Sequence, residues 1–465
     1  MFIRLKINDT VHLKKHYSLE DHILYFLHIP KTAGTTFTFT LDSYYDIHEI
    51  YPERIFSKLI QNPPINFPNL KLIRGHFGHG ISKLLSKPPL YLTFLRDPIE
   101  RTLSFYDHMR LDPYTNNWTN SNFILDEDNI SQLLENKNKE KVFTNNQTRH
   151  IALDLDIEKL IDIYKFKNNG NFLLEEFDEF LSPQISENEL ILKAKENLQK
   201  FAFVGLTEKT IESYFLFCYT FGLQPLGNLW KLMITPKRTD VNSLDQSTLN
   251  KIKKCNKLDL ELYTFAKQLF DFRYSQMIND LKELYQINSI DENSLNIKMY
   301  DFLDQNYKQQ FQMNYNIQNF VDYNFSEKFN GYGWYYREFI PEYGTYYRWT
   351  GPSTESTVDF LLQNNVNYIV ELDVIKYISI EQLEKFQLNV NNNNVELKII
   401  SKNNDKISFL GLIPKSFHKS QDQLMRLKIK IPKVLETNLT NLELSDSRLV
   451  GLAFSNIKIY PNPKY

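Results

Sequence analysis

The stretch His28-Ile-Pro-Lys-Thr-Ala-Gly-Thr-Thr-Phe37 follows an apolar run from Ile23 to Leu27. Together they predict a strand, an anion-binding loop and a helix. Pro30 ends the strand, and the small residues after it allow backbone N–H groups to turn toward an anion. The positive N-terminal end of the next helix would face the same anion. The stretch therefore predicts a phosphate site in an α/β fold.

Several residues of this loop are candidate ligands of that phosphate. Lys31 would add a full positive charge, although elsewhere it would be interpreted as an ordinary surface lysine. The Walker A spacing GxxxxGK[ST] cannot be placed on the loop, which disfavours an ordinary magnesium-dependent NTPase. The predicted phosphate-binding residues of the loop are Lys31, Thr32, Ala33, Gly34, Thr35 and Thr36.

A second stretch, Tyr91-Leu-Thr-Phe-Leu-Arg-Asp-Pro-Ile-Glu-Arg-Thr-Leu-Ser-Phe-Tyr106, predicts another buried strand followed by a helix. Pro98 suits the first turn of that helix. Arg96 would lie at the end of the strand, and Ser104 lies eight positions later, about two helical turns away. Both can face one anion, although Arg96 could instead pair with Asp97 or Glu100.

The two loops resemble those of carbohydrate sulfotransferases related to heparan sulfate 2-O-sulfotransferase. Three further stretches resemble the family's motifs in the family's order, and five ordered motifs are a specific signal. The resemblance spans about residues 20 to 280. The three stretches are Arg74-Gly-His-Phe-Gly-His79, Asn145-Asn-Gln-Thr-Arg-His150 and Phe201-Ala-Phe-Val-Gly-Leu-Thr-Glu-Lys-Thr-Ile-Glu-Ser213.

The resemblance implies the sulfuryl donor 3'-phosphoadenosine 5'-phosphosulfate (PAPS) and an in-line transfer to a glycan hydroxyl. It places Lys31 at the 5'-phosphosulfate, where it would assist the leaving group, and Arg96 and Ser104 at the 3'-phosphate. It implies His76 as the catalytic base, with His79 as the competing candidate. Arg149 would touch the cofactor or orient the loop.

The pair Lys237-Arg238 is the last candidate for the cofactor site. Arg238 would close over the 3'-phosphate, or the pair would simply be solvated. No His, Cys or Asp spacing suggests a dedicated metal site, and the predicted chemistry needs no metal.

The texture of the sequence changes after about residue 285. The first half alternates strand-like and helix-like segments, as a P-loop-like parallel sheet flanked by helices requires. The second half carries short apolar runs between Asn-rich turns, which is typical of an all-β sandwich. We therefore predict a sulfotransferase domain at 1–285, a linker at 286–314 and a β-sandwich at 315–465 that is a carbohydrate-binding or structural module.

The 465 residues carry 54 Lys and Arg against 56 Asp and Glu, so no overall basic charge favours nucleic acid as a partner. The two cysteines cannot form a disulfide framework. No signal peptide or apolar run long enough to span a bilayer is apparent, and animal relatives of the family have an N-terminal anchor. These features predict a cytoplasmic enzyme, and the family resemblance implies a glycan or oligosaccharide acceptor.

Two other functions remain open at this point. One is a P-loop-like nucleotide kinase, and the other is a catalytically inactive glycan-binding protein. Aromatic residues of the second half could stack on sugar rings, but aromatic residues of a sandwich usually pack inward. The residues in question are Trp334, Tyr346, Tyr347 and Trp349.

Overall fold

The computed structural model describes residues 17, 22–32, 34–42, 44–45, 47–54, 58–59, 62–111, 129–152, 185–225, 239–286, 295–326, 330–403, 405–417, 423–437 and 448–462. The chain divides into two compact units. Unit 1 comprises Met1–Thr38, His48–Leu223 and Lys231–Leu295. Unit 2 comprises Phe39–Ile47, Gln224–Trp230 and Asn296–Tyr465.

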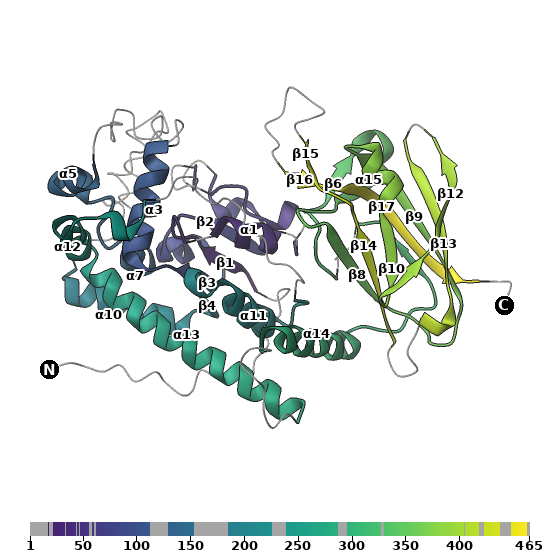
Figure 1. Ribbon diagram of the computed structural model, residues 1–465, viewed down its shortest axis with the longest axis horizontal. Coiled ribbons are helices and arrows are strands. Elements are labelled where there is room, and N and C mark those ends of the chain that lie inside the picture. Colours follow the sequence, from purple (N-terminus) through teal and green to yellow (C-terminus); the bar gives the residue numbers. More distant parts are fainter. Residues whose placement is uncertain are drawn as a thin grey trace. The chain divides into compact units, whose positions relative to one another are not determined.

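Unit 1 is built around a parallel sheet with strand order β2-β1-β3-β4 (Figure 1). The central strand β1 (Leu24–Leu27) is buried throughout, as expected for a parallel strand covered on both faces. The other strands are β2 (Leu72–Gly75), β3 (Leu90–Leu95) and β4 (Phe203–Leu206). Strands β1 and β3 coincide with the two apolar stretches that precede the predicted loops, and all four strands are parallel, which confirms the predicted parallel sheet.

Helices flank this sheet, as predicted. Helix α13 packs against α10, α11 and β4. Its 28 residues, together with α12, account for the helical pattern of the sequence between Ser247 and Tyr285. The helices in this part of the chain are α1 (Gly34–Asp42), α3 (Pro98–Leu111), α5 (Ile130–Glu135), α6 (Lys137–Glu140), α7 (Asn146–Ala152), α10 (Glu187–Lys200), α11 (Thr210–Phe221), α12 (Gln246–Cys255) and α13 (Lys257–Leu284).

The carboxyl ends of parallel strands meet at one edge of a sheet, and this edge collects the sequence motifs. The loop with Lys31 follows β1, His76 follows β2, and Arg96 follows β3. Thr207 follows β4, and its hydroxyl donates to the carbonyl of Leu95 at 3.2 Å. Ligands of open α/β sheets bind at this edge, so the topology places the candidate residues where a site is expected.

Unit 2 contains two large antiparallel sheets, of order β11-β10-β14-β8 and β12-β13-β9-β17-β7-β6, with β5 paired to β17, and a two-stranded sheet of β15 and β16. Side chains from the two large sheets form one apolar core. Strand β9 alternates buried and half-buried residues, as a strand with one face toward a core does. The predicted antiparallel all-β region is therefore confirmed.

The strands of unit 2 and its short helix follow in chain order. Several strands coincide with the short apolar runs between the Asn-rich turns of the second half of the sequence. They are β5 (Val321–Tyr323), β6 (Glu338–Ile340), β7 (Thr345–Trp349), β8 (Glu355–Leu361), β9 (Tyr368–Tyr377), α15 (Ile380–Lys385), β10 (Gln387–Val390), β11 (Asn393–Val395), β12 (Leu397–Lys402), β13 (Ile407–Ile413), β14 (Leu424–Lys430), β15 (Leu435–Glu436), β16 (Leu449–Val450) and β17 (Leu452–Pro461).

The predicted linker at 286–314 includes helix α14 (Leu295–Asn314). Tyr307 and Phe311 of this helix form an apolar cluster with Leu361 and Leu424 of the sandwich strands. The helix is thus part of the packing of unit 2. The boundary at residue 285 stays a prediction.

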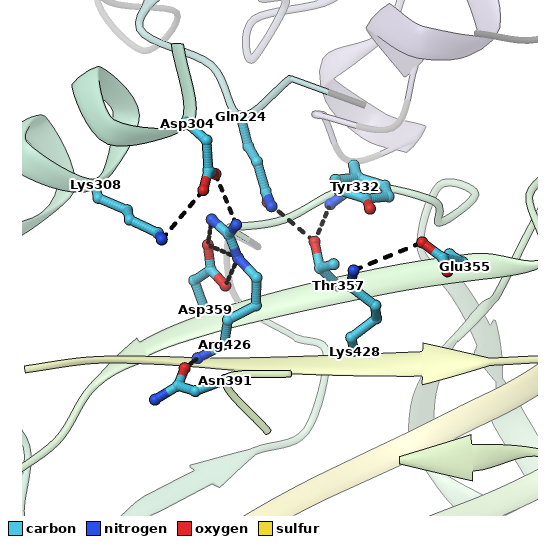
Figure 2. A network of polar contacts seen from close by, with 10 residues as sticks. All are labelled: Gln224, Asp304, Lys308, Tyr332, Glu355, Thr357, Asp359, Asn391, Arg426 and Lys428. Atoms are coloured by element: carbon cyan, nitrogen blue, oxygen red, sulfur yellow. Dashed lines mark hydrogen bonds and ion pairs between the residues drawn. The ribbon is translucent and has the colours of Figure 1, made fainter. Parts of the chain in front are cut away.

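A buried ion-pair network joins α14 to strands β8 and β14 (Figure 2). The Arg426 guanidinium forms a bidentate pair with Asp359, at 2.9 Å from Nε to Oδ1 and 2.9 Å from Nη2 to Oδ2. Its Nη1 lies 2.6 Å from Asp304 Oδ1. The side-chain amide of Gln224 lies 3.0 Å from the hydroxyl of Thr357 in the same network. Arg426 and Lys308, whose Nζ lies 3.1 Å from Asp304 Oδ2, together balance the two carboxylates.

We expect Arg426→Met to lower the free energy of unfolding of unit 2 by about 3–5 kcal/mol, because Asp359 would lose its bidentate partner while fully buried. Urea unfolding of the full chain, followed by far-UV circular dichroism, measures the loss. Lys428→Met is the matched control on the same strand, since Lys428 pairs with Glu355 at 3.7 Å in a more exposed position. Equal losses of unfolding free energy in the two variants would show that the buried network contributes no more to stability than the more exposed Lys428–Glu355 pair.

Candidate functional site

The loop after β1 is shaped by contacts within the loop itself. Lys31 has a backbone φ of 69°, in the left-handed region. The hydroxyl of Thr32 is fully buried and donates to the carbonyl of Ile29 at 2.9 Å. A Cβ atom on Gly34 would lie 2.0 Å from Cδ2 of His28, so only glycine fits against this ring. The chain therefore turns tightly around His28 before α1 begins.

The described residues cover the predicted phosphate loop only in part. Ala33 lies outside them, as do the side chains of Thr35 and Thr36. Thr32 supports the loop through its bond to Ile29, a use of its hydroxyl that the sequence did not indicate. Lys31 and Gly34 lie between the end of β1 and the start of α1, where a helix N-terminus and a cation can meet an anion.

Arg96 links the second predicted motif to the first. Its Nη1 donates to the carbonyl of Lys31 at 3.3 Å, and its Nη2 pairs with Glu100 at 3.2 Å. The sequence left Asp97 and Glu100 as alternative partners of Arg96, and in the structure Arg96 pairs with Glu100. The carboxylate of Asp97 accepts instead from the backbone N–H groups of Ile99 and Glu100 and so caps α3.

Ser104 lies on α3 and is buried, with 4% of its surface exposed. Arg101, one turn before it, is fully buried. Within the described part of the chain, Nε and Nη2 of Arg101 have no hydrogen-bond partner. Burial lowers the pKa of Arg101 to about 10, and the nearby charge of Arg96 lowers it further while Asp259 opposes the shift. Two guanidinium groups thus lie close enough to repel each other, which suits a region that receives an anion.

Arg149 lies on α7, and its Nη1 donates to the carbonyl of Lys141 at 3.3 Å. Burial lowers its pKa to about 10, against the opposing effect of Asp259. Arg238 lies outside the described residues. Thr239, which follows it, donates from its N–H and its hydroxyl to the carboxylate of Asp107 on α3, each at 2.7 Å.

His76 is held in a defined orientation. Its Nδ1 lies 2.6 Å from the carbonyl oxygen of His28, and a carbonyl oxygen can only accept. Nδ1 therefore carries the proton, and Nε2 keeps the lone pair of a base. Burial lowers the pKa of His76, although the bond to His28 opposes the shift. Burial favours the neutral ring, and the hydrogen bond at Nδ1 leaves Nε2 as the nitrogen that can accept a proton.

Two more histidines lie near His76. The ring of His28 lies 4.6 Å from that of His76 between centroids, and burial holds the pKa of His28 well below its usual range. Burial lowers the pKa of His150 to about 3, and the neighbouring His76 lowers it further because protons on both rings would repel each other. The Nδ1 atom of His150 lies 2.8 Å from the carbonyl oxygen of Asn146. Three neutral imidazoles thus surround the ends of β1 and β2.

His79, the competing candidate for the base, lies in an aromatic stack. Its ring lies 4.6 Å from that of Tyr91 and 6.2 Å from that of Phe201, nearly parallel to both. The hydroxyl of Tyr91 donates to the carbonyl of His79 at 2.6 Å. These contacts support a packing role for His79.

Several residues that shape the site cannot be identified from sequence motifs alone. His28, Arg101 and Gln147 lie inside the motif stretches, at positions that the motifs do not mark. Asp259 lies on α13 without any local motif and is fully buried. Its only sequence signal is a carboxylate among the helix's apolar positions, which is also typical of a solvated helix.

Most of the aromatic residues considered for sugar stacking belong to the interior of unit 2. Trp334, Tyr347 and Trp349 are at most 6% exposed. The indole N–H of Trp334 donates to the carbonyl of Thr357 at 2.8 Å. Tyr346 is partly exposed and lies under the guanidinium of Arg337, 4.4 Å from the ring centroid. The inward packing favoured by the fold class therefore holds for three of the four.

Among the described residues, no group of three or more His, Cys, Asp or Glu side chains is arranged to hold a metal ion. Within the same residues, no helix combines the length and the apolar character that crossing a membrane requires.

Comparison with known proteins gives relatives of one kind. The chain is 29% identical over 196 residues to heparan-sulfate 6-O-sulfotransferase 2 of Gallus gallus, which covers 40% of this chain and 45% of the relative. It is 28% identical over 192 residues to heparan-sulfate 6-O-sulfotransferase 3 of Homo sapiens, covering 40% and 38%. The chain thus spans less than half the length of these curated relatives. They are 6-O enzymes by name, whereas the motifs had suggested the 2-O enzymes.

A solved family 35 carbohydrate binding module of Clostridium thermocellum aligns with 31% of this chain and 96% of its own length, at 8% identity and a TM-score of 0.18, which assigns no fold. The sequence pattern of the sulfotransferase family matches residues 17–266. This match covers more than half of the 465 residues and includes all five motifs. The chain therefore belongs to the sulfotransferase family.

Proposed function

We propose that the chain is a PAPS-dependent O-sulfotransferase that acts on a hydroxyl of a glycan. The contact between Arg96 Nη1 and the carbonyl of Lys31 carries the proposal. It brings the residue expected at the 3'-phosphate and the residue expected at the 5'-phosphosulfate to one edge of the sheet. His76 follows the neighbouring strand β2 at the same edge.

The donor set fits an anionic nucleotide. Nε and Nη2 of the buried Arg101 have no acceptor among the described residues, and the charge of Arg96 lies close enough to lower the pKa of Arg101. Lys31 and the N-terminus of α1 add positive charge beside them. We infer that Arg96 and Ser104 hold the 3'-phosphate and that Lys31 with the loop N–H groups holds the 5'-phosphosulfate.

PAPS would supply the sulfuryl group, whose bond to the 5'-phosphate oxygen breaks as the sugar oxygen bonds to sulfur, with 3'-phosphoadenosine 5'-phosphate (PAP) as the leaving product. His76 would accept the hydroxyl proton at Nε2, because its Nδ1 proton is held by the carbonyl of His28. Lys31 would stabilise the negative charge that develops on the leaving phosphate. The chain's own residues thus provide a base on one side and a cation on the other.

The direct test is binding of PAP to the full chain. We expect PAP at about a hundred times its Kd to stabilise the protein by about 2.7 kcal/mol, seen as a rise in Tm by differential scanning fluorimetry. Transfer of radiolabelled sulfate from PAPS to a panel of glycans then tests the reaction and its acceptor. A shift with ATP and magnesium but none with PAP would instead identify a nucleotide kinase.

Arg96→Met should raise the Kd for PAP about 10- to 100-fold, because a charge-assisted bond to the phosphate is lost. Isothermal titration calorimetry with PAP and with adenosine 5'-phosphate separates the two phosphate sites, and only the PAP affinity should fall. Arg110→Met is the matched control on α3, since Arg110 lies over Tyr106 and is farther along the helix. An unchanged PAP affinity in Arg96→Met would remove this residue from the site.

A further inference from the structure

The side chain of Gln147 forms hydrogen bonds with both backbone polar groups of Arg96. Its Oε1 accepts from the N–H of Arg96 at 3.0 Å, and its Nε2 donates to the carbonyl of Arg96 at 2.9 Å. Arg96 lies just past the last paired residue of β3, Leu95, which is opposite Leu206. The amide of Gln147 therefore continues the hydrogen bonding of the sheet by one residue. It fixes the backbone from which the guanidinium extends.

Gln147 is itself held firmly. The fully buried carboxylate of Asp259 accepts from the N–H of Gln147 at 3.0 Å and from the N–H and the hydroxyl of Thr148, each at 2.7 Å. In return, the side chain of Asn145 accepts from the N–H of Leu258 at 2.9 Å. Each of the two helices α7 and α13 thus has its first turn capped by a residue from the other segment.

The same segment also contacts the second buried arginine. Asn146 Oδ1 lies 3.4 Å from Nη1 of Arg101 on α3. Consecutive residues Asn146 and Gln147 therefore contact two arginines that lie five positions apart on either side of the start of α3. Nothing in this arrangement contacts the sulfuryl group or the acceptor directly. Its effect is on the positions of the guanidinium groups of Arg96 and Arg101.

We propose that Gln147, anchored by Asp259, is a positioning residue that sets Arg96 for the 3'-phosphate of the donor nucleotide. The proposal rests on the function proposed above. Holding the backbone of Arg96 before the ligand arrives reduces the ordering that binding must otherwise complete. Gln147 should therefore act on affinity for the 3'-phosphate and have little effect on the transfer step.

Gln147→Met, which keeps the length of the side chain and removes both hydrogen bonds, should raise the Kd for PAP about 10-fold. The affinity for adenosine 5'-phosphate, which lacks the 3'-phosphate, should stay within twofold, and so should kcat at saturating PAPS. In an Arg96→Met background the same change should weaken PAP binding little further, because the two residues act on one contact. Gln382→Met is the control, since Gln382 is a fully buried glutamine of unit 2 whose Nε2 donates to two carbonyls.

Gln147→Glu provides a second test if the methionine variant does not fold. An ionised carboxylate cannot donate to the carbonyl of Arg96, whereas a protonated carboxyl can. The ratio of the variant's Kd for PAP to that of the wild type should therefore fall toward one as the pH is lowered. A ratio that is constant with pH, or a Gln147→Met variant that binds PAP and adenosine 5'-phosphate as the wild type does, would overturn the proposal. Failure of the wild type to bind PAP would instead overturn the proposed function.

Discussion

His76→Ala should lower kcat for sulfate transfer by about 10²- to 10⁴-fold while leaving the Kd for PAP nearly unchanged. The structure supports this separation because Nδ1 of His76 is bonded to His28, so Nε2 is the atom left for the acceptor's proton. Steady-state kinetics with labelled PAPS, together with calorimetric PAP titration, measures the two quantities separately.

The lowered pKa of His76 predicts how the rate of sulfate transfer depends on pH. Only the neutral imidazole can accept a proton, and burial lowers the pKa of His76 below the ordinary histidine value of about 6.5. The rate should therefore stay constant as the pH falls past 6.5 and should decline only as it passes through the lowered pKa. A rate already halved near pH 6.5 would show that a less buried group is the base.

His79→Ala is the matched control for His76→Ala. His79 is stacked on Tyr91, so its loss should reduce stability without removing a base. If His79→Ala proves the more damaging to kcat while both variants bind PAP, the base is His79. If neither change affects kcat, the base lies elsewhere in the chain.

Lys31→Ala should lower kcat by about 10²- to 10³-fold, the usual cost of removing one group that stabilises developing charge, and should also weaken PAP binding. Lys31 has a positive φ, and alanine meets the same backbone cost there, so the comparison isolates the ammonium group. Single-turnover kinetics with PAPS measures the chemical step directly.

Lys71→Ala is the control for Lys31→Ala. Lys71 pairs with Glu49 at 2.7 Å just before β2, at the opposite end of that strand from His76. It should change neither PAP affinity nor kcat by more than about twofold. A full rate in Lys31→Ala would mean that backbone N–H groups alone stabilise the leaving phosphate.

The sheet and the main candidate residues could be predicted because both depend on local patterns. Apolar runs such as Leu24–Leu27 coincide with strands, and motifs placed directly after such runs must lie at the carboxyl edge. The choice between His76 and His79 could not be made in this way. It depends on which ring stacks on Tyr91 and which one reaches the carbonyl of His28.

The residues that support the site could not be predicted from the sequence, for a different reason. Gln147 and Asp259 are 112 positions apart, and Gln147 and Arg96 are 51 apart. Their hydrogen bonds follow from how α7 and α13 pack, which no local spacing encodes. Likewise, the sequence could not show that Trp334 donates to Thr357 inside the sandwich core. Long-range packing decides such contacts.

The three buried imidazoles beside β1 and β2 make the stability of the protein depend on pH. An unfolded histidine binds its proton near pH 6.5, whereas folding lowers the pKa of His28, His76 and His150, the last to about 3. Their contribution to stability is therefore complete above pH 6.5 and is lost as the pH falls from there, by about 1.4 kcal/mol per pH unit for each group that stays unprotonated. We therefore expect acidification to destabilise the fold in addition to protonating His76, the proposed base.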